Sequence, residues 1–181
     1  MLARKPQPDS NTPAHGESVH TEFLKKVPLF ADLAKTPEAI TALAHFMTEV
    51  AFQPGSTIIE EGAVARDMYI LVEGKVNVFK KTPDGDPFKV AILDGSMHPY
   101  FGESALLTTD DERSATITAE TACKCLVLTS ADFQKYAEAN PKWAVPFYRK
   151  VAGGVLGRLK KTNSDLMTLY KALVAEIRGT H

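Results

Sequence analysis

Short apolar runs separated by glycine-containing turns fill the middle of the chain, between residues 50 and 128. The turns recur at Pro54-Gly55, Glu61-Gly62, Glu73-Gly74, Asp84-Gly85 and Asp94-Gly95. Two segments alternate apolar and polar residues like strands with one buried face: Val76 with Val78, and Phe88 with Val90 and Ile92. Many short, evenly spaced strands are typical of a jelly roll or barrel. We therefore expect a mainly β fold, a β-roll (double-stranded β-helix) with flanking helices.

Helical patterns flank this region on both sides. Before it, Thr36 offers an N-cap and Pro37 suits the first position of a helix. After it, a helix from residue 130 breaks at Asn140-Pro141, and a long helical segment then runs to Ile177. The polar, Pro-rich first residues lack apolar anchors. We expect a disordered tail at 1–20, one domain at 21–140 and a C-terminal helix at 141–181.

Composition limits the function classes. With 181 residues we expect a single core, and a net charge of -1 gives no general attraction for nucleic acid. The longest apolar run, 68–72, is far below the roughly 20 residues that cross a bilayer, so we expect no membrane segment. The two cysteines, Cys123 and Cys125, suit a core strand in a reducing cytoplasm better than a metal site. The five histidines are scattered, and neither a metal site nor an enzyme is expected.

The long C-terminal helix carries an apolar seam in steps of four and three residues. Its members are Val155, Leu159, Thr162, Leu166, Leu169 and Leu173. This spacing is that of a coiled coil, so we expect a homodimer through this helix. The other interpretation is a helix that packs on its own domain.

The stretch from Phe101 to Thr116 has the residue types of an anion-binding site. Gly102 lets the backbone approach a ligand, and a helical turn from Ser104 can point free N–H groups at a negative charge. Arg113 can supply a guanidinium group to the same anion. Glu103 would be repelled by an anion alone, so the ligand must also present a donor. A 3',5'-cyclic nucleotide, with one phosphate and one free 2'-OH, fits this combination.

These residues resemble the cassette of the cyclic nucleotide-binding domain family. The sequence reads Phe-Gly-Glu-Ser-Ala-Leu-Leu from residue 101 and Arg-Ser-Ala-Thr from residue 113. The resemblance runs from about residue 22 to 140 and includes Val27-Pro28-Leu29-Phe30, Pro54-Gly55-Ser56-Thr57-Ile58-Ile59, Tyr69-Ile70-Leu71-Val72-Glu73-Gly74 and Asp132-Phe133. The bacterial catabolite activators, whose ligand is cAMP, are especially similar at Glu112-Arg113-Ser114-Ala115 and at Thr121-Ala122-Cys123 downstream.

The resemblance implies a role for each cassette residue. Glu103 would accept a hydrogen bond from the ribose 2'-OH and Arg113 would bind the phosphate. Gly102, Ser104 and Ser114 would line the phosphate. The resemblance favours cAMP as the ligand, and cGMP stays open because Ser114 can also hydrogen-bond a syn guanine.

The purine has candidate contacts outside the cassette. Residues 158–163 resemble the dimer helix of the family, whose polar residues reach the purine, so Thr162 or Asn163 is expected to cover the base. A tolerated polar residue in the seam explains Thr162 equally well. Val90 is the apolar candidate for the purine, with a purely core role as the alternative.

The chain departs from the family pattern at His98, where glycine is usual, and we expect a longer loop there. We also expect no helix-turn-helix and no DNA partner. The sequence thus predicts a cytoplasmic cyclic nucleotide sensor that regulates an unidentified downstream protein through helix rearrangement. A ligand-free β-roll scaffold, in which Glu103 and Arg113 pair, is one alternative. Haem sensing through His98 is another.

Overall fold

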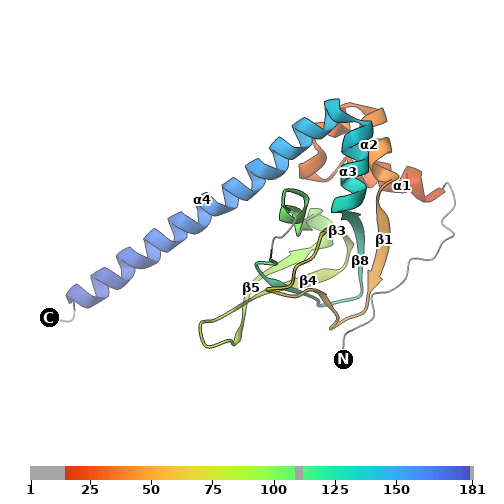
Figure 1. The fold of residues 1–181 in the computed structure, drawn as a ribbon. Helices are drawn as coiled ribbons and strands as arrows, with labels where there is room; N and C mark the ends of the chain where they lie inside the picture. The colour runs from red at the N-terminus through yellow and green to blue at the C-terminus, as the bar shows by residue number, and fades with distance from the viewer. Residues whose placement is uncertain (1–14, 109–111, 180–181) are drawn as a thin grey trace.

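Two antiparallel four-stranded sheets pack into a β-roll, with helices at one end (Figure 1). The computed structural model describes residues 15–108 and 112–179, and the side chains from residue 20 onward. The sheets have the strand orders β1-β8-β3-β6 and β2-β7-β4-β5. This confirms the predicted β-roll with flanking helices. The strands are β1 (Thr48–Phe52), β2 (Thr57–Ile59), β3 (Asp67–Glu73), β4 (Lys75–Lys81), β5 (Pro87–Asp94), β6 (Tyr100–Phe101), β7 (Thr116–Ala119) and β8 (Cys123–Thr129).

The helices lie before and after the roll in the sequence. Helix α1 begins at His15 and so overlaps the stretch 1–20 predicted to be a disordered tail. Leu24, at the end of this helix, is fully buried in the core and anchors it. Residues 1–14 of that predicted tail lie outside the described residues. Pro37 opens α2 as predicted, although the Thr36 side chain makes no capping hydrogen bond. The helices are α1 (His15–Leu24), α2 (Pro37–Ala44), α3 (Ser130–Ala139) and α4 (Pro141–Gly179), with short 3-10 turns η1 (Pro28–Phe30), η2 (Leu33–Lys35), η3 (Gly95–Met97) and η4 (Glu103–Leu106).

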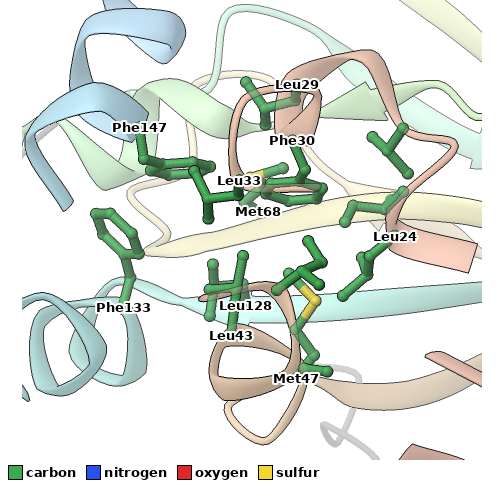
Figure 2. Close-up of a cluster of buried hydrophobic side chains, with 14 of the residues drawn as sticks. Leu24, Leu29, Phe30, Leu33, Leu43, Met47, Met68, Leu128, Phe133 and Phe147 are labelled. Carbon is green, nitrogen blue, oxygen red and sulfur yellow. The ribbon is translucent and has the colours of Figure 1, made fainter. Parts of the chain in front are cut away.

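The buried apolar residues form two clusters rather than the single core expected from chain length. Strand β3 separates the clusters, because its alternate side chains point to opposite faces of the sheet. Met68 and Ile70 join a cluster under the helices, while Tyr69 and Leu71 join one inside the roll. Figure 2 shows the helical cluster, in which Phe147 of α4 lies beside Phe30 and Phe133. The first turns of α4 therefore belong to the domain core.

Both cysteines lie inside the roll, as the sequence predicts. Cys123 and Cys125 are free and buried among apolar side chains. Burial raises the pKa of the Cys125 thiol to about 12, with a smaller contribution from Cys123. This thiol is therefore protonated at neutral pH and behaves as a small apolar group.

Strand β5 differs from its predicted pattern. Phe88, Val90 and Ile92 were expected on one buried face, but all three are exposed. β5 is the edge strand of its sheet, and a register shift opposite Val78 and Phe79 leaves Val90 in a bulge. Ile92 pairs with Asn77, on the face opposite to that of Val76. The bulge and the edge position together explain why the alternation did not predict burial.

Helix α4 is continuous through Pro146 and extends away from the roll (Figure 1). Its early residues Ala144, Phe147 and Val151 are buried, whereas the residues beyond Val155 are mostly exposed. Among the described helices, none combines the length and apolar content that a bilayer span requires.

Candidate functional site

The cassette turns at a glycine whose backbone no other residue adopts readily. Gly102 follows β6 with φ +73° and ψ 14°, a left-handed conformation, and leads directly into η4. A Cβ at this position would lie 2.6 Å from Nη1 of Arg113 and 2.9 Å from the carbonyl oxygen of Asp67. The turn therefore needs glycine for its conformation and for the space that Arg113 occupies.

Arg113 is a buried cation fixed against this turn. Its side chain is 5% exposed, and Nη1 donates a hydrogen bond of 3.0 Å to the carbonyl oxygen of Gly102. Nη2 donates to the carbonyl oxygen of Asp67. The Arg113 backbone is held as well, because its N–H donates to Ala63 O at 2.9 Å and its carbonyl accepts from Gly62 N–H at 2.8 Å. The guanidinium group is therefore held in place before any ligand arrives.

Glu103, the first residue of η4, is a buried carboxylate that contacts helix α4. It is 5% exposed, and its Oε1 forms an ion pair with Nη2 of Arg158. Arg158 shares this part of α4 with the exposed Lys160 and Lys161, and the ion pair distinguishes it from these basic neighbours. No periodicity identifies this contact, because it depends on where η4 meets α4 in the fold.

The η4 turn presents backbone donors at its start. Its bonds begin with Ala105 N–H to the carbonyl oxygen of Gly102, at 3.2 Å. The N–H groups of Glu103 and Ser104 precede this bond, at the end of the turn where donors lack partners within the helix. The turn starts one residue earlier than predicted. Ser104 is half-buried and Ser114 exposed, while residues 109–111 of the cassette lie outside the described residues.

Aromatic rings lie directly beside the cassette. Phe101 stacks on Tyr69 with centroids 5.5 Å apart and an interplanar angle of 13°, and Tyr69 also meets Phe52 edge-on. Burial, followed by the Asp67 carboxylate, raises the pKa of Tyr69 to about 12, although Arg113 opposes the shift. Tyr69 is therefore neutral at physiological pH and supports the cassette through packing. The sequence analysis did not single out this aromatic pair.

His98 occupies the position where glycine is usual in the family. Its backbone is left-handed, with φ 51° and ψ 47°, which explains a preference for glycine there. Its ring lies 5.2 Å from the ring of Phe23 on α1. The predicted longer loop is a single 3-10 turn, η3, in which the Asp94 carboxylate accepts a 3.0 Å hydrogen bond from Ser96 N–H.

The structure brings together Gly102, Glu103 and Arg113, with Ser104 beside them in η4. The three candidates for the purine lie in other elements. Val90 is 45% exposed in the β5 bulge, and Thr162 and Asn163 are exposed on α4 beyond Arg158. Their contact with a base stays a prediction.

One buried cation and one buried carboxylate therefore lie at the glycine turn of a β-roll. Among known families, the one described as Cyclic nucleotide-binding domain matches residues 49–140, which are about half of the chain. The chain belongs to this cyclic nucleotide-binding domain family, and its fold is that of the family. Domains of this family are regulatory ligand-binding modules.

The similar proteins differ in how much of their own length this chain covers. Potassium/sodium hyperpolarization-activated cyclic nucleotide-gated channel 1 of Homo sapiens is 34% identical over 164 residues, which are 89% of this chain and 17% of the channel. The cAMP-dependent protein kinase regulatory subunit of Dictyostelium discoideum is 37% identical over 65% of this chain and 35% of the subunit. The catabolite activator protein of Thermus thermophilus superposes with a TM-score of 0.67 at 27% identity, over 78% of this chain and 62% of that one. The chain therefore spans only part of the curated relatives it matches.

Proposed function

We propose that this chain is a cytoplasmic sensor of cAMP that binds its ligand in the cassette between Phe101 and Thr116. The observation that carries the proposal is the convergence of two buried charges, Arg113 and Glu103, on the turn at Gly102. A cyclic phosphate supplies an anion for Arg113, and the ribose 2'-OH supplies a donor for Glu103.

Each polar group of the cassette has a role in this proposal. The guanidinium group of Arg113 and the N–H groups at the start of η4 bind the phosphate. Gly102, Ser104 and Ser114 line it, and one oxygen of Glu103 accepts from the 2'-OH. Glu103 contacts Arg158 through Oε1, so its other oxygen can take the ribose without breaking the ion pair.

The preference for cAMP over cGMP rests on similarity to a kinase regulatory subunit named as cAMP-dependent and on the motif around Arg113. Val90, Thr162 and Asn163 are the proposed contacts to the purine. If α4 closes toward the cassette, Thr162 is the polar residue of the seam and lies about one helical turn beyond Arg158. A guanine would instead gain a hydrogen bond from Ser114.

The output of the sensor is a change in α4. A ligand shifts a conformational equilibrium only through its different affinities for the two states. Glu103 provides such a difference, because it contacts both the proposed ribose position and Arg158 of α4. The exposed seam of α4 favours self-association, for which the predicted homodimer is the smallest assembly. With a net charge of -1, we propose a protein rather than DNA as the downstream target.

Isothermal titration calorimetry of the purified chain against cAMP, cGMP and a cyclic dinucleotide tests the proposal. We expect cAMP to bind most tightly. Arg113→Ala should weaken binding by about 2–5 kcal/mol, or roughly 30-fold to several-thousand-fold, because it removes a buried charge partner. Arg149→Ala, which removes an exposed arginine of α4, is the matched control and should bind normally. Absence of heat with every nucleotide would favour the ligand-free scaffold, and normal cAMP binding by Arg113→Ala would show that the phosphate lies elsewhere.

A further inference from the structure

The distal half of α4 exposes far more apolar surface than an isolated helix tolerates in water. It extends clear of the roll in Figure 1. Large contiguous apolar surfaces of this kind mark interaction sites. Eight large apolar side chains here are each more than half exposed: Leu156, Leu159, Leu166, Met167, Leu169, Tyr170, Leu173 and Ile177.

These side chains form two parallel stripes rather than one. The first, the seam stripe, consists of Leu159, Leu166, Leu169 and Leu173 together with the other two seam residues, Val155 and Thr162. The second stripe contains Leu156, Met167, Tyr170 and Ile177, and at 3.6 residues per turn its centre lies about 80° around the helix from the seam stripe. A two-stranded coiled coil needs only a narrow seam of a and d positions. A dimer closed through the seam stripe would therefore leave the second stripe in water.

The residue types along the seam also argue against a pair of helices. The steps of four and three residues put leucine at every a position, Leu159, Leu166 and Leu173. They put the β-branched residues Val155 and Thr162 at two of the three d positions. Parallel dimers favour the reverse, with β-branched residues at a and leucine at d, whereas leucine at a with isoleucine at d favours trimers and tetramers.

The charged flanks of the apolar face indicate how neighbouring helices are oriented. The flank beside the second stripe is basic, with Lys160, Lys171 and Arg178. The flank beside the seam stripe begins with Arg158, which is paired with Glu103, and beyond it carries Asp165 and Glu176. Asp165 also forms an ion pair with Lys161 of the same helix. Parallel helices related by rotation place opposite flanks together, whereas antiparallel pairing would bring like charges together. Charge complementarity therefore favours parallel copies of this same helix as the occupant of the face.

We propose that the distal halves of four α4 helices form a parallel four-helix bundle. The seam stripe of each helix packs against the second stripe of its neighbour, so every helix uses both stripes. Seen down the bundle axis, the directions from one helix to its two neighbours differ by roughly 90° in a ring of four helices and by roughly 60° in a ring of three. The separation of about 80° between the two stripes is nearer to the angle in a ring of four. This assembly takes the place of the dimer predicted from the seam, and the proposal does not rest on nucleotide binding.

Multi-angle light scattering of the full chain, at several concentrations with and without cAMP, tests the bundle. We expect a mass four times the 19.8 kDa of one chain. Tyr170→Glu places a charge in the second stripe, which is buried in a four-helix bundle but lies at the edge of a two-helix seam, so it should abolish the tetramer. Leu166→Glu should abolish every assembly. Ser164→Glu adds the same charge to the exposed polar face and should leave the tetramer intact.

Each other outcome overturns the four-helix bundle. A wild-type dimer, trimer or monomer contradicts it, as does a tetramer that Tyr170→Glu leaves unchanged. Co-sedimentation of a wild-type monomer or dimer with phosphatidylserine vesicles, lost in Tyr170→Glu, would assign the second stripe to a lipid surface instead. Calorimetry with cAMP on the same samples separates the two proposals: tight binding by a chain that is not tetrameric leaves the sensor standing and refutes only the bundle.

Discussion

Replacing Gly102 by alanine should disturb stability and ligand binding together. The alanine Cβ would lie 2.6 Å from Nη1 of Arg113 and 2.9 Å from the Asp67 carbonyl oxygen, both too close for contact. The backbone at φ +73° is also unfavourable for alanine. The first effect displaces the guanidinium group that we assign to the phosphate, whereas the second is a cost to folding alone.

Gly55→Ala separates these two costs. Gly55 has φ +82°, and a Cβ added there would meet nothing within 4 Å, so its substitution measures the backbone cost alone. We expect that cost to be about 1–2 kcal/mol. Gly102→Ala should add about 1–3 kcal/mol for the forced displacement of packed atoms. With an m-value of about 2 kcal/mol/M, the two urea midpoints should differ by roughly 0.5–1.5 M.

Urea unfolding followed by circular dichroism measures the stabilities, and calorimetry measures cAMP affinity. Gly102→Ala should bind cAMP at least about tenfold more weakly, because Arg113 can no longer keep its 3.0 Å hydrogen bond to residue 102. Gly55→Ala should bind like the wild type. Equal destabilisation of the two variants, with unchanged affinity in both, would refute the argument that Gly102 makes room for Arg113.

Two further predictions concern α4 and α3. Arg158→Ala should weaken cAMP binding by about 1–2 kcal/mol, because it removes the ion-pair partner of buried Glu103, a pair that is half-exposed on the arginine side. Lys160→Ala, which removes an exposed lysine of the same helix, is the control. If calorimetry finds the same cAMP affinity for both variants, Arg158 does not belong to the site. Burial raises the pKa of Asp132, but hydrogen bonds from Lys135 and Thr129 outweigh it and lower the pKa below 3.8. The stabilisation is therefore present above pH 3.8 and lost as pH falls through the lowered pKa. Asp132→Asn should cost about 0.5–1 kcal/mol at neutral pH and converge with the wild type in acid, as thermal unfolding can measure; an equal loss at both pH values would point to the cap geometry instead.

The strand pattern predicted β4 in part and β5 poorly, and the reason for β5 is physical. β4 lies between β7 and β5, and Val76 is fully buried as the alternation predicts, but its polar neighbour Asn77 is buried as well and Val78 is only half-buried. β5 has a neighbour on one side only, and its bulge at Val90 changes which side chains face inward. A bulge inserts one residue without a characteristic sequence signal, so alternation alone does not place it.

The cassette was predictable because its chemistry is local in sequence. Gly102 and Glu103 are adjacent and Arg113 follows ten residues after Glu103, so the residue types alone predicted the candidate site. The contacts that complete it come from distant segments: the Asp67 carbonyl from β3 and Arg158 from α4. Arg158 stands in a basic helical segment whose neighbours are solvent-exposed, and only the folded position of η4 distinguishes it from them.

The pairing of Glu103 with Arg158 also bears on how the sensor could act in an assembly. Glu103 belongs to the turn that faces the proposed ligand, and Arg158 stands at the start of the exposed apolar face of α4. A ligand that alters the position or charge environment of Glu103 therefore changes the free energy of one α4 orientation relative to another. Linkage makes this effect reciprocal, so any arrangement of α4 imposed by neighbouring copies changes cAMP affinity by the same factor. Where the helices share one bundle, a shift of one α4 must be accommodated by the others, and binding to one copy then changes the affinity of the rest. Tyr170→Glu, which leaves the cassette untouched, should accordingly reduce the Hill coefficient of cAMP binding toward one, and an unchanged coefficient above one would place the coupling elsewhere in the chain.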